Sequence, residues 1–214
     1  MAEGRRERAD AARNRRAILR ATEELLALHR PEQVSMEQVA AAAGVGKGTV
    51  FHRFGNRMGL MRALMTERAL ALHEAVTTGP PPLGPGAPPD ERLLAFLDAV
   101  VDVVARNKGL LAALGHAATT AQRSPEDARG TQPVYEFWHG HITALIGQER
   151  PDLDAGLLAH MLLATLSSVP ILRLLEQDDG RRLADSLRAQ ATALLNTSAS
   201  PTDRGTKTSP APGP

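Results

Sequence analysis

The sequence predicts an all-α protein with a small N-terminal group of helices and a larger helical body. Alanine and leucine dominate the apolar residues, and aromatic residues make up only 3% of the chain, a composition that favours helix over sheet. Apolar residues recur every three or four positions, and no segment of useful length alternates with a period of two. Residues typical of helix starts and stops bound these periodic segments.

Composition excludes several classes of protein. The chain has no cysteine, so disulfides and thiolate chemistry are absent, and a zinc site would need histidine and carboxylate ligands alone. The most apolar run, 157–175, is interrupted by His160, Pro170 and Arg173 and is interpreted as a buried helix, not a membrane span. The arginine-rich N-terminus has no apolar stretch behind it and does not resemble a signal peptide. We expect a soluble cytoplasmic protein without a cofactor.

Charge is distributed unevenly along the chain. Residues 1–78 hold 13 Lys/Arg and 9 Asp/Glu, a balance of +4, whereas residues 79–214 hold 12 and 15, a balance of −3. A basic front end on a mildly acidic body predicts that the front end binds an anionic polymer. A solvated basic tail is the alternative interpretation of the same charge pattern.

The first two helices have clear boundaries. Residues 1–12 are expected to form a basic, flexible arm, and a helix is expected over 10–29, where Arg30-Pro31 ends it. Ser35 is a natural N-cap for the next helix, and Gln38 completes a capping box with it. Gly44 ends this second helix because glycine tolerates the left-handed backbone of a helix C-terminus.

Further helices follow along the chain. A short one is expected over 46–54, and a fourth over 56–77 with Asn56 as its N-cap. The Pro/Gly segment 79–89 cannot be helical and is interpreted as a connector or exposed loop. Asp90 is expected to cap the first helix of the body, and Pro170 should kink a later one. The body helices are predicted near 90–107, 109–122, 131–148, 152–177 and 181–196, before a disordered tail over 197–214.

The segment "GVGKGT", residues 44–49, superficially resembles a phosphate-binding loop. A P-loop needs Ser or Thr after Gly-Lys and a buried strand before its first glycine. Here Gly48 follows Lys47, Ala41 occupies the position of the first glycine, and a helix precedes. A nucleotide-binding enzyme that uses this segment is therefore the weaker alternative. No nucleophile elbow, HExxH motif or clear carboxylate pair supports catalysis, and we expect no enzyme.

The same residues fit a helix-turn-helix, in which a capped helix, a glycine turn and a second short helix cross closely. The run "VSMEQVAAAAGVGKGTVFHRFGNRMGLMRAL", with "RRAILRATEELL" before it, resembles the DNA-binding domain of the TetR family of bacterial transcriptional regulators. The resemblance covers roughly residues 13–64, and its specific part is the T-[VLI]-[YF]-x-x-[FV]-x-[NS]-[KR] ending at Arg57. It implies a helix-turn-helix DNA-binding domain over 13–55, followed by a helical regulatory domain over 56–196.

The resemblance also implies roles for individual residues. Lys47 and Gly48 would lie at the start of the recognition helix, where Lys47 reaches a guanine edge or a phosphate and Gly48 lets the backbone approach the DNA. Thr49, His52 and Arg57 match the phosphate contacts of the family, and Ser35 and Met36 match a second backbone-phosphate contact. Arg13, Arg15 and Arg16 would neutralise phosphates or enter the minor groove.

This sequence departs from the family at two places. Phe51 and His52 stand where two tyrosines are usual, so hydroxyl contacts to phosphate are lost and Phe51 is either a DNA contact or part of the core. The glycine common in the first inter-helix loop is replaced near Arg30-Pro31, so that turn must have a different shape. Met36 is expected to pack while its backbone binds. The remaining apolar positions are expected to form the core of the domain: Val34, Val39, Val45, Val50, Phe54 and Leu60.

For the body, the resemblance implies a ligand cavity and a dimer interface. A homodimer through the helices at 152–177 and 181–196 would let two recognition helices read a palindromic operator, and both helices carry apolar faces. We expect a ligand-responsive regulator, a repressor that a small-molecule effector releases from DNA. Scattered histidines are a weak signal for a metal, and none is expected. Polar residues within apolar helices are the candidate ligand contacts, although any one of them is more often a surface residue or a hydrogen-bonded core residue: Arg106, His116, Thr119, Tyr135, Trp138, His139 and His160, with Thr120, Gln122 and His141 beside them.

Overall fold

The computed structural model describes residues 2–118, 125–176 and 180–197. Its secondary structure over these residues is helical, which confirms the predicted all-α class. The elements in chain order are α1 (Ala2–Leu28), the 3-10 helix η1 (Pro31–Gln33), α2 (Met36–Ala42), α3 (Lys47–Phe54), α4 (Arg57–Thr78), α5 (Pro89–Ala118), α6 (Pro125–Glu149), α7 (Ala155–Ser167), α8 (Val169–Glu176) and α9 (Gly180–Asn196).

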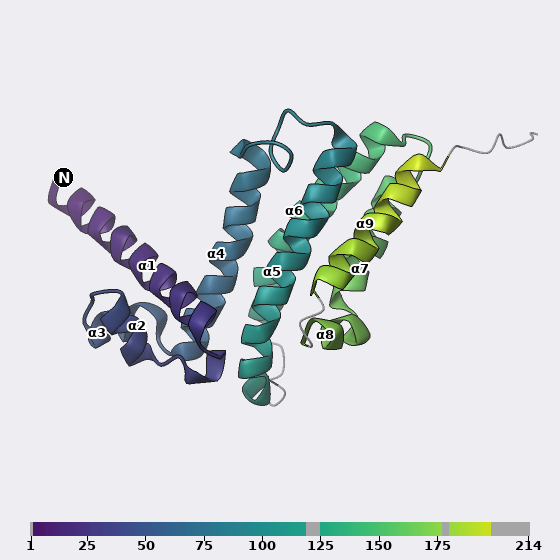
Figure 1. Cartoon of the computed structure of the whole chain (residues 1–214). Helices are drawn as coiled ribbons and strands as arrows, with labels where there is room; N and C mark the ends of the chain where they lie inside the picture. Colours follow the sequence, from purple (N-terminus) through teal and green to yellow (C-terminus); the bar gives the residue numbers. More distant parts are fainter. Residues whose placement is uncertain (1, 119–124, 177–179, 198–214) are drawn as a thin grey trace, which may run out of the picture.

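The helices form two groups that α4 connects. Helices α1 to α3 lie together at one end, with the N-terminal part of α1 projecting outward, and we call residues 2–56 the head (Figure 1). Helices α5, α6, α7 and α9 run side by side, and the short α8 lies across one end of them (Figure 1). We call residues 89–197 the body. Helix α4 leaves the head and runs along the body, so it belongs to both groups.

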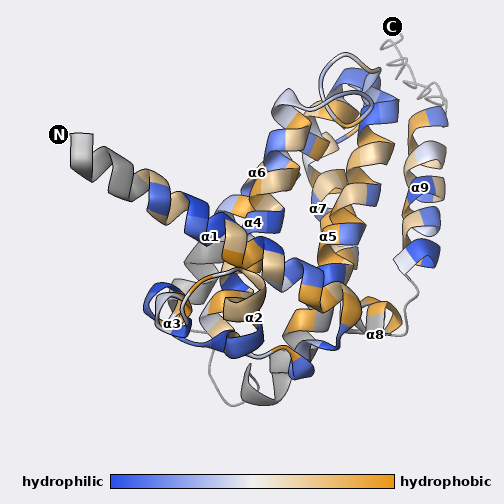
Figure 2. Cartoon of the chain, turned by 60° about the vertical axis from the view of Figure 1, so that its left-hand side comes forward, coloured by the Kyte–Doolittle hydropathy of each residue, from blue (hydrophilic) through white to orange (hydrophobic). Residues whose placement is uncertain are grey.

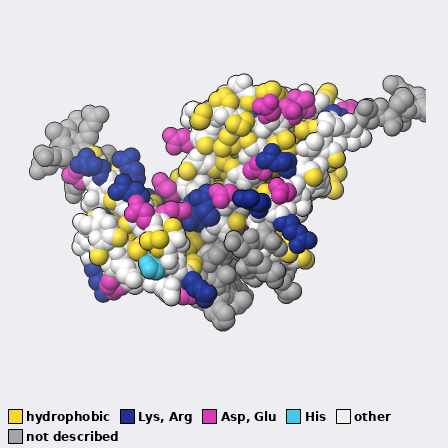
Figure 3. All heavy atoms as spheres, viewed as in Figure 1, with side chains coloured by type: hydrophobic (Ala, Val, Ile, Leu, Met, Phe, Trp, Pro, Cys, Tyr) yellow, Lys and Arg dark blue, Asp and Glu magenta, His cyan; other side chains and the backbone are white. Residues whose placement is uncertain are grey.

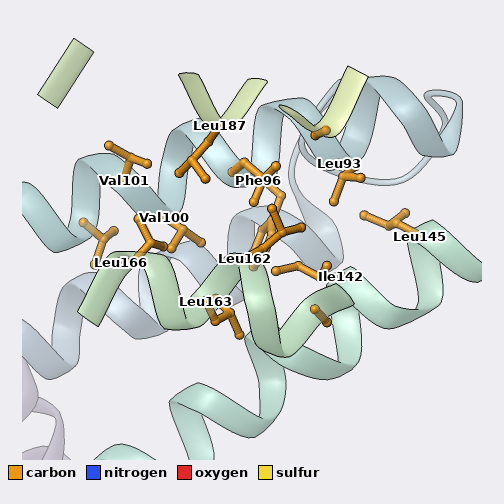
Figure 4. Packing of buried hydrophobic residues seen from close by; sticks show 14 of the residues in the cluster. Leu93, Phe96, Val100, Val101, Ile142, Leu145, Leu162, Leu163, Leu166 and Leu187 are labelled. Atoms are coloured by element: carbon orange, nitrogen blue, oxygen red, sulfur yellow. The ribbon is translucent and has the colours of Figure 1, made fainter. Parts of the chain in front are cut away.

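Each group has its own buried core. The head core forms around Ile18, Val39 and Val50, all fully buried, and includes Leu60 and Leu64 from the first half of α4. The body core surrounds Phe96, which is fully buried between α5 and the facing side chains of α6, α7 and α9 (Figure 4). Leu72 and Val76 from the second half of α4 belong to this second core. Burial of apolar surface therefore holds α4 at both ends.

Local sequence signals in the head are confirmed. The Ser35 Oγ accepts a hydrogen bond from the Gln38 amide at 3.2 Å, and the Gln38 side chain accepts one from the Ser35 amide at 2.8 Å. Gly44 has φ +65° at the end of α2, the left-handed conformation that favours glycine. The Asn56 side chain caps α4 by accepting from the Gly59 amide at 2.9 Å.

Two helices are longer than predicted. Helix α1 begins at Ala2 and not at residue 10, so the residues expected to be an irregular arm are helical. Helix α5 begins at Pro89 and runs to Ala118, whereas the sequence predicted two helices separated near Gly109. A glycine inside a helix costs only about 1 kcal/mol relative to alanine, so the packing of a long apolar helix outweighs it. Helix α6 likewise includes Pro133 and begins six residues before the predicted 131.

The predicted helix over 152–177 is broken, not kinked. Helix α7 ends at Ser167, the next residue Ser168 has an extended ψ of 141°, and α8 then begins at Val169. Pro170 lies in the first turn of α8, a position that proline tolerates because its missing N–H would be unpaired there anyway. The chain therefore stops one helix and starts another instead of bending a single one.

The apolar stripe of α9 lies within the subunit. Leu183, Leu187 and Ala191 are buried in the body core against α5. Hydrophilic residues alternate with these apolar ones along the α9 ribbon (Figure 2), and among them Arg182, Asp185 and Ser186 are exposed. The stripe that suggested a dimer contact for this helix is thus already used by the fold of one chain.

Candidate DNA-binding surface and helical body

Helix α3 presents a short exposed surface because its apolar residues point inward. Val50 is fully buried and Phe54 is 8% exposed, so these two residues fix the rotation of the helix in the head. Lys47, Gly48 and His52 are exposed on the other side. Phe51 is 38% exposed, which places it on the outer surface and not in the core.

Lys47 is held by two neighbours in the free protein. Its Nζ lies 2.5 Å from the Glu37 carboxylate of α2 and 5.5 Å from the centre of the Phe51 ring. The hydrogen bond from Lys47 lowers the pKa of Glu37 below its usual value. Glu37 is not among the contacts predicted from the sequence, because two residues ten positions apart carry no signal of this pairing unless the helix-turn-helix geometry is already assumed.

The other predicted contacts in the head occupy different environments. Met36 is buried, which agrees with its expected packing role, and Ser35 uses its hydroxyl as the α2 cap. Arg57 donates a hydrogen bond to the Pro31 carbonyl, and its Nε is buried without a partner among the described residues. The Arg57 side chain thus holds the turn at η1 that replaces the usual glycine loop.

Arginines of α1 extend this surface. Arg13 is exposed and pairs with Asp10 within the same helix. The Arg15 guanidinium lies 5.6 Å from the centre of the Phe54 ring and 3.9 Å from the Glu67 carboxylate. Basic side chains from α1 and α3 therefore lie on one head, as the charge distribution predicts, but several of them are already paired.

Helices α2 and α3 and the turn between them form a helix-turn-helix whose second helix is exposed and polar. The model for bacterial regulatory proteins of the tetR family matches residues 18–64. These residues are a TetR-family DNA-binding domain. Within the segment 44–49, residues 44–46 accordingly belong to the turn between α2 and α3, and residues 47–49 are the first residues of α3. The segment follows a helix instead of the strand that a nucleotide-binding loop would require.

Solved structures of bacterial regulators have a similar fold over most of this chain. The fatty acid degradation regulator FadR from Bacillus halodurans is 20% identical, with 86% of this chain and 95% of that one covered and a TM-score of 0.58. FadR from Bacillus subtilis in complex with stearoyl-CoA is 16% identical, with 84% of this chain and 97% of that one covered and a TM-score of 0.52. The TetR-family regulator PfmR from Thermus thermophilus is 18% identical, with 86% of this chain and 96% of that one covered and a TM-score of 0.51. No curated protein matches the sequence significantly.

Three predicted ligand residues gather on the outer surface of α6 and α7. The Tyr135 hydroxyl lies 2.6 Å from the His160 Nδ1, and the His139 and His160 rings are 3.9 Å apart. His139 Nε2 also lies 3.1 Å from the Gly156 carbonyl oxygen. Tyr135 is 41% exposed, and Leu157 and Met161 beside this group are 56% and 55% exposed. The cluster is therefore a partly apolar surface patch.

Trp138 and His141 lie deeper in the body. Trp138 packs against the body core, and its indole Nε1 is buried without a partner among the described residues. Burial of the His141 ring, together with the nearby charge of Arg92, lowers its pKa from 6.5 to about 4. The centres of the His141 and Phe96 rings are 4.7 Å apart. Because its pKa is lowered, His141 is neutral at neutral pH and packs as part of an aromatic group.

Arg106 belongs to a charged network where the head meets the body. Arg68 of α4 makes a bidentate bond to Glu23 of α1, with its Nη2 3.0 Å from each carboxylate oxygen, and donates to Asn107 of α5 at 2.9 Å. The Nη1 of Arg106 lies 3.7 Å from a carboxylate oxygen of the same Glu23, and its Nη2 lies 2.5 Å from a carboxylate oxygen of Asp102. This network ties three helices together, and no sequence pattern connects residues so far apart.

The two remaining candidates lie outside the residues whose side chains can be placed. They are His116 and Thr119, with Thr120 and Gln122 next to them. Within the described residues, no helix combines the length and the apolar character that crossing a membrane would need.

Proposed function

We propose that this chain is a ligand-responsive transcriptional repressor that binds a palindromic DNA operator as a homodimer. The observation that carries the proposal is the exposed surface of α3, which a buried Val50 and Phe54 hold at a fixed angle inside a TetR-family domain. The proposed domain limits are 13–55 for DNA binding and 56–196 for regulation.

The proposed DNA contacts divide into two kinds. Lys47 and Gly48 at the start of α3 are proposed to enter the major groove, where a lysine can bind the acceptors of a guanine. Thr49, His52, Arg57 and the Ser35–Met36 backbone are proposed to contact phosphate. Arg13 adds a contact that depends on charge and not on base sequence.

Dimerisation is proposed through the exposed face of α7. Two copies related by a two-fold axis would present two α3 helices to the two halves of a palindrome. The apolar side chains of Leu157 and Met161 on this face are available for such a contact, whereas the apolar stripe of α9 packs inside its own chain. The outer face of α9 would contribute mainly polar contacts.

Ligand response is proposed to work by a population shift. One dimer conformation spaces the two α3 helices for successive major grooves, and another holds them too far apart. A ligand that binds the second conformation more tightly lowers the operator affinity by its differential binding free energy. The complex of a structurally similar regulator, FadR from Bacillus subtilis, with stearoyl-CoA supports a small-molecule effector in general terms.

Binding of the full chain to the DNA upstream of its own coding sequence tests the proposal. We expect footprints on two half-sites about one helical turn apart. The affinity should fall steeply with salt because basic side chains displace counterions from phosphates. Lys47→Ala should weaken binding about tenfold or more, whereas the control Arg188→Ala, which also removes one positive charge but from the body, should not. Equal affinities for the two variants would contradict the assignment of α3.

The pairing of Lys47 with Glu37 gives a second, opposite test. Glu37 competes with DNA for Lys47, and its negative charge also repels nearby phosphates. We expect Glu37→Gln to raise DNA affinity several-fold, most clearly at low salt where screening is weakest. Electrophoretic mobility shifts over a salt series would measure it, and a loss of affinity would show that Glu37 positions Lys47 for DNA instead of competing for it.

A further inference from the structure

A groove lies at the junction of head and body, away from the α3 surface and from the α6–α7 patch. Its volume is about 960 Å³, and described residues of α1, η1, α4, α5, α8 and α9 line it. Small-molecule sites commonly have volumes of about 300–1,000 Å³. Figure 3 shows side chains of both charges gathered over the middle of the molecule, where the head meets the body.

Part of the lining of the groove is apolar. Val101 and Leu110 of α5 and Leu175 of α8 contribute to it and are each less than 10% exposed, with values of 3%, 2% and 8%. Leu26 of α1 and Ala184 of α9 lie at its sides. Ala27 of α1 is exposed and Leu26 and Ala184 are partly exposed, so a hydrocarbon group that covers these three side chains would gain free energy from the apolar area it removes from water.

The charged side chains of the groove are paired, with one exception. Arg68 pairs with Glu23, Arg106 pairs with Asp102, and Asp98 pairs with Arg188 at the rim. Arg181, which opens α9, lines the groove but makes no hydrogen bond or ion pair with any residue that the structure describes. The only charge here without a compensating partner among the described residues is therefore positive.

We propose that this groove binds an amphipathic anion, a carboxylate on a hydrocarbon chain. The chain covers the apolar lining and the carboxylate pairs with Arg181, whose planar guanidinium can donate two parallel hydrogen bonds to it. An amphipathic cation fits less well, because the carboxylates that would receive it are already bonded to arginines and would have to break those pairs.

The position of the groove also gives it a regulatory role, which rests on the proposed function. Its walls contain Glu23 and Arg68 on one side and Asp102 and Arg106 on the other, which are the residues that tie α1 and α4 to α5. A ligand between these walls changes the separation of α1 from α5. The angle of the head relative to the body, and with it operator affinity, then depends on occupancy.

Titration of the full chain with decanoate and with decyltrimethylammonium, both below their micelle-forming concentrations, tests the binding. Isothermal calorimetry should show saturable binding of decanoate and at least tenfold weaker binding of the cation. Arg181→Ala should weaken decanoate binding about tenfold, since a hydrogen bond to a charged group is worth roughly one such factor. Arg181→Lys keeps the charge but loses the two parallel hydrogen bonds, so its affinity should lie between those of the wild type and Arg181→Ala. Absence of decanoate binding, or equal affinity for the two amphiphiles, would overturn the proposal.

A steric pair of variants locates the ligand. Ala184→Trp fills the groove and should abolish decanoate binding, whereas Ala189→Trp adds the same side chain to the exposed face of α9 and should leave binding unchanged. Circular dichroism would show that both variants fold, and the Arg181 variants keep the test decisive if Ala184→Trp does not. Binding that survives Ala184→Trp in a folded protein would place the ligand elsewhere and overturn the assignment.

The same variants separate this inference from the proposed function. Decanoate should lower the affinity of the wild-type protein for its upstream DNA, and Arg181→Ala should reduce that effect while binding DNA normally without ligand. Decanoate binding with the expected variant pattern but no DNA binding would refute the proposed function and leave the groove assignment standing. DNA binding that decanoate does not alter in a saturated protein would refute the regulatory role of the groove.

Discussion

The head and the body reach their structures by different means. In the head, short helices meet at angles set by local features, such as the Ser35 cap, the left-handed Gly44 and the Asn56 cap. In the body, long helices pack around Phe96, and α5 and α6 continue through Gly109 and Pro133, residues that would favour a break. Local sequence therefore determines the shape of the candidate DNA-binding surface, whereas long-range packing determines the shape of the surfaces on which regulation would depend.

Loss of a large side chain from the body core should give the largest effect. Phe96 is fully buried, and we expect Phe96→Ala to lower the free energy of unfolding by about 3–5 kcal/mol because it leaves a cavity. Phe51→Ala is the matched control, since that ring lies on the outside of the head. It should change stability by less than about 0.5 kcal/mol while weakening DNA binding. Urea unfolding would measure both, and similar losses would contradict the contrast between core and surface.

The link between the two regions should give the next largest effect. The Arg68 side chain is 8% exposed, and removing it leaves Glu23 without its bidentate partner. We expect Arg68→Met to cost about 1–3 kcal/mol, a range that allows for the partial exposure of Glu23. Head and body should also unfold less cooperatively, which two spectroscopic probes would reveal as separate transitions. Arg20→Ala, which breaks an exposed pair with Glu24, should have almost no effect.

A pH dependence is expected in the body. The pKa of His141 is lowered from 6.5 to about 4 by burial and by Arg92, so between these pH values the unfolded chain binds a proton that the folded chain does not. Stability from this group is complete above pH 6.5 and is lost as the pH falls toward 4. The loss should reach about 1–2 kcal/mol, after allowance for the partial exposure of the ring.

His141→Phe tests this pH dependence. A phenyl ring can pack between Phe96 and Phe137, which the imidazole already contacts, and it has no proton to bind. Urea unfolding at pH 7 and pH 5 should therefore show a smaller difference in the variant than in the wild type. An unchanged difference would assign the pH dependence to other groups.

Gly48 should give the smallest change in stability and the clearest separation of stability from function. A Cβ at this position would meet no atom within 4 Å, so Gly48→Ala should stabilise the head by about 0.5–1 kcal/mol through helix propensity. The same methyl group would prevent close approach of the backbone to DNA and should weaken operator binding. If thermal unfolding shows the gain but DNA affinity is unchanged, Gly48 does not face the DNA.

The contrast between the regions also explains what could be predicted from the sequence. The bounds of α2, α3 and α4 were correct within one or two residues because caps and glycines mark them locally. The long α5 and the break at Ser168 were missed, since packing outweighs the cost of Gly109 and a proline at a helix start resembles one inside a helix. The pairing of Glu23 with Arg68 joins residues 45 positions apart and depends on tertiary structure alone.

The sharing of α4 between two cores has a mechanical consequence. Its 22 residues span about 33 Å at 1.5 Å per residue, and buried side chains anchor it near both ends. A stiff rod held in this way cannot shift at one end without moving the other, and a tilt of about 5° displaces the far end by roughly 3 Å over that length. Such a displacement is comparable to a hydrogen-bond length, which is enough to make or break the contacts of a recognition helix with its base pairs.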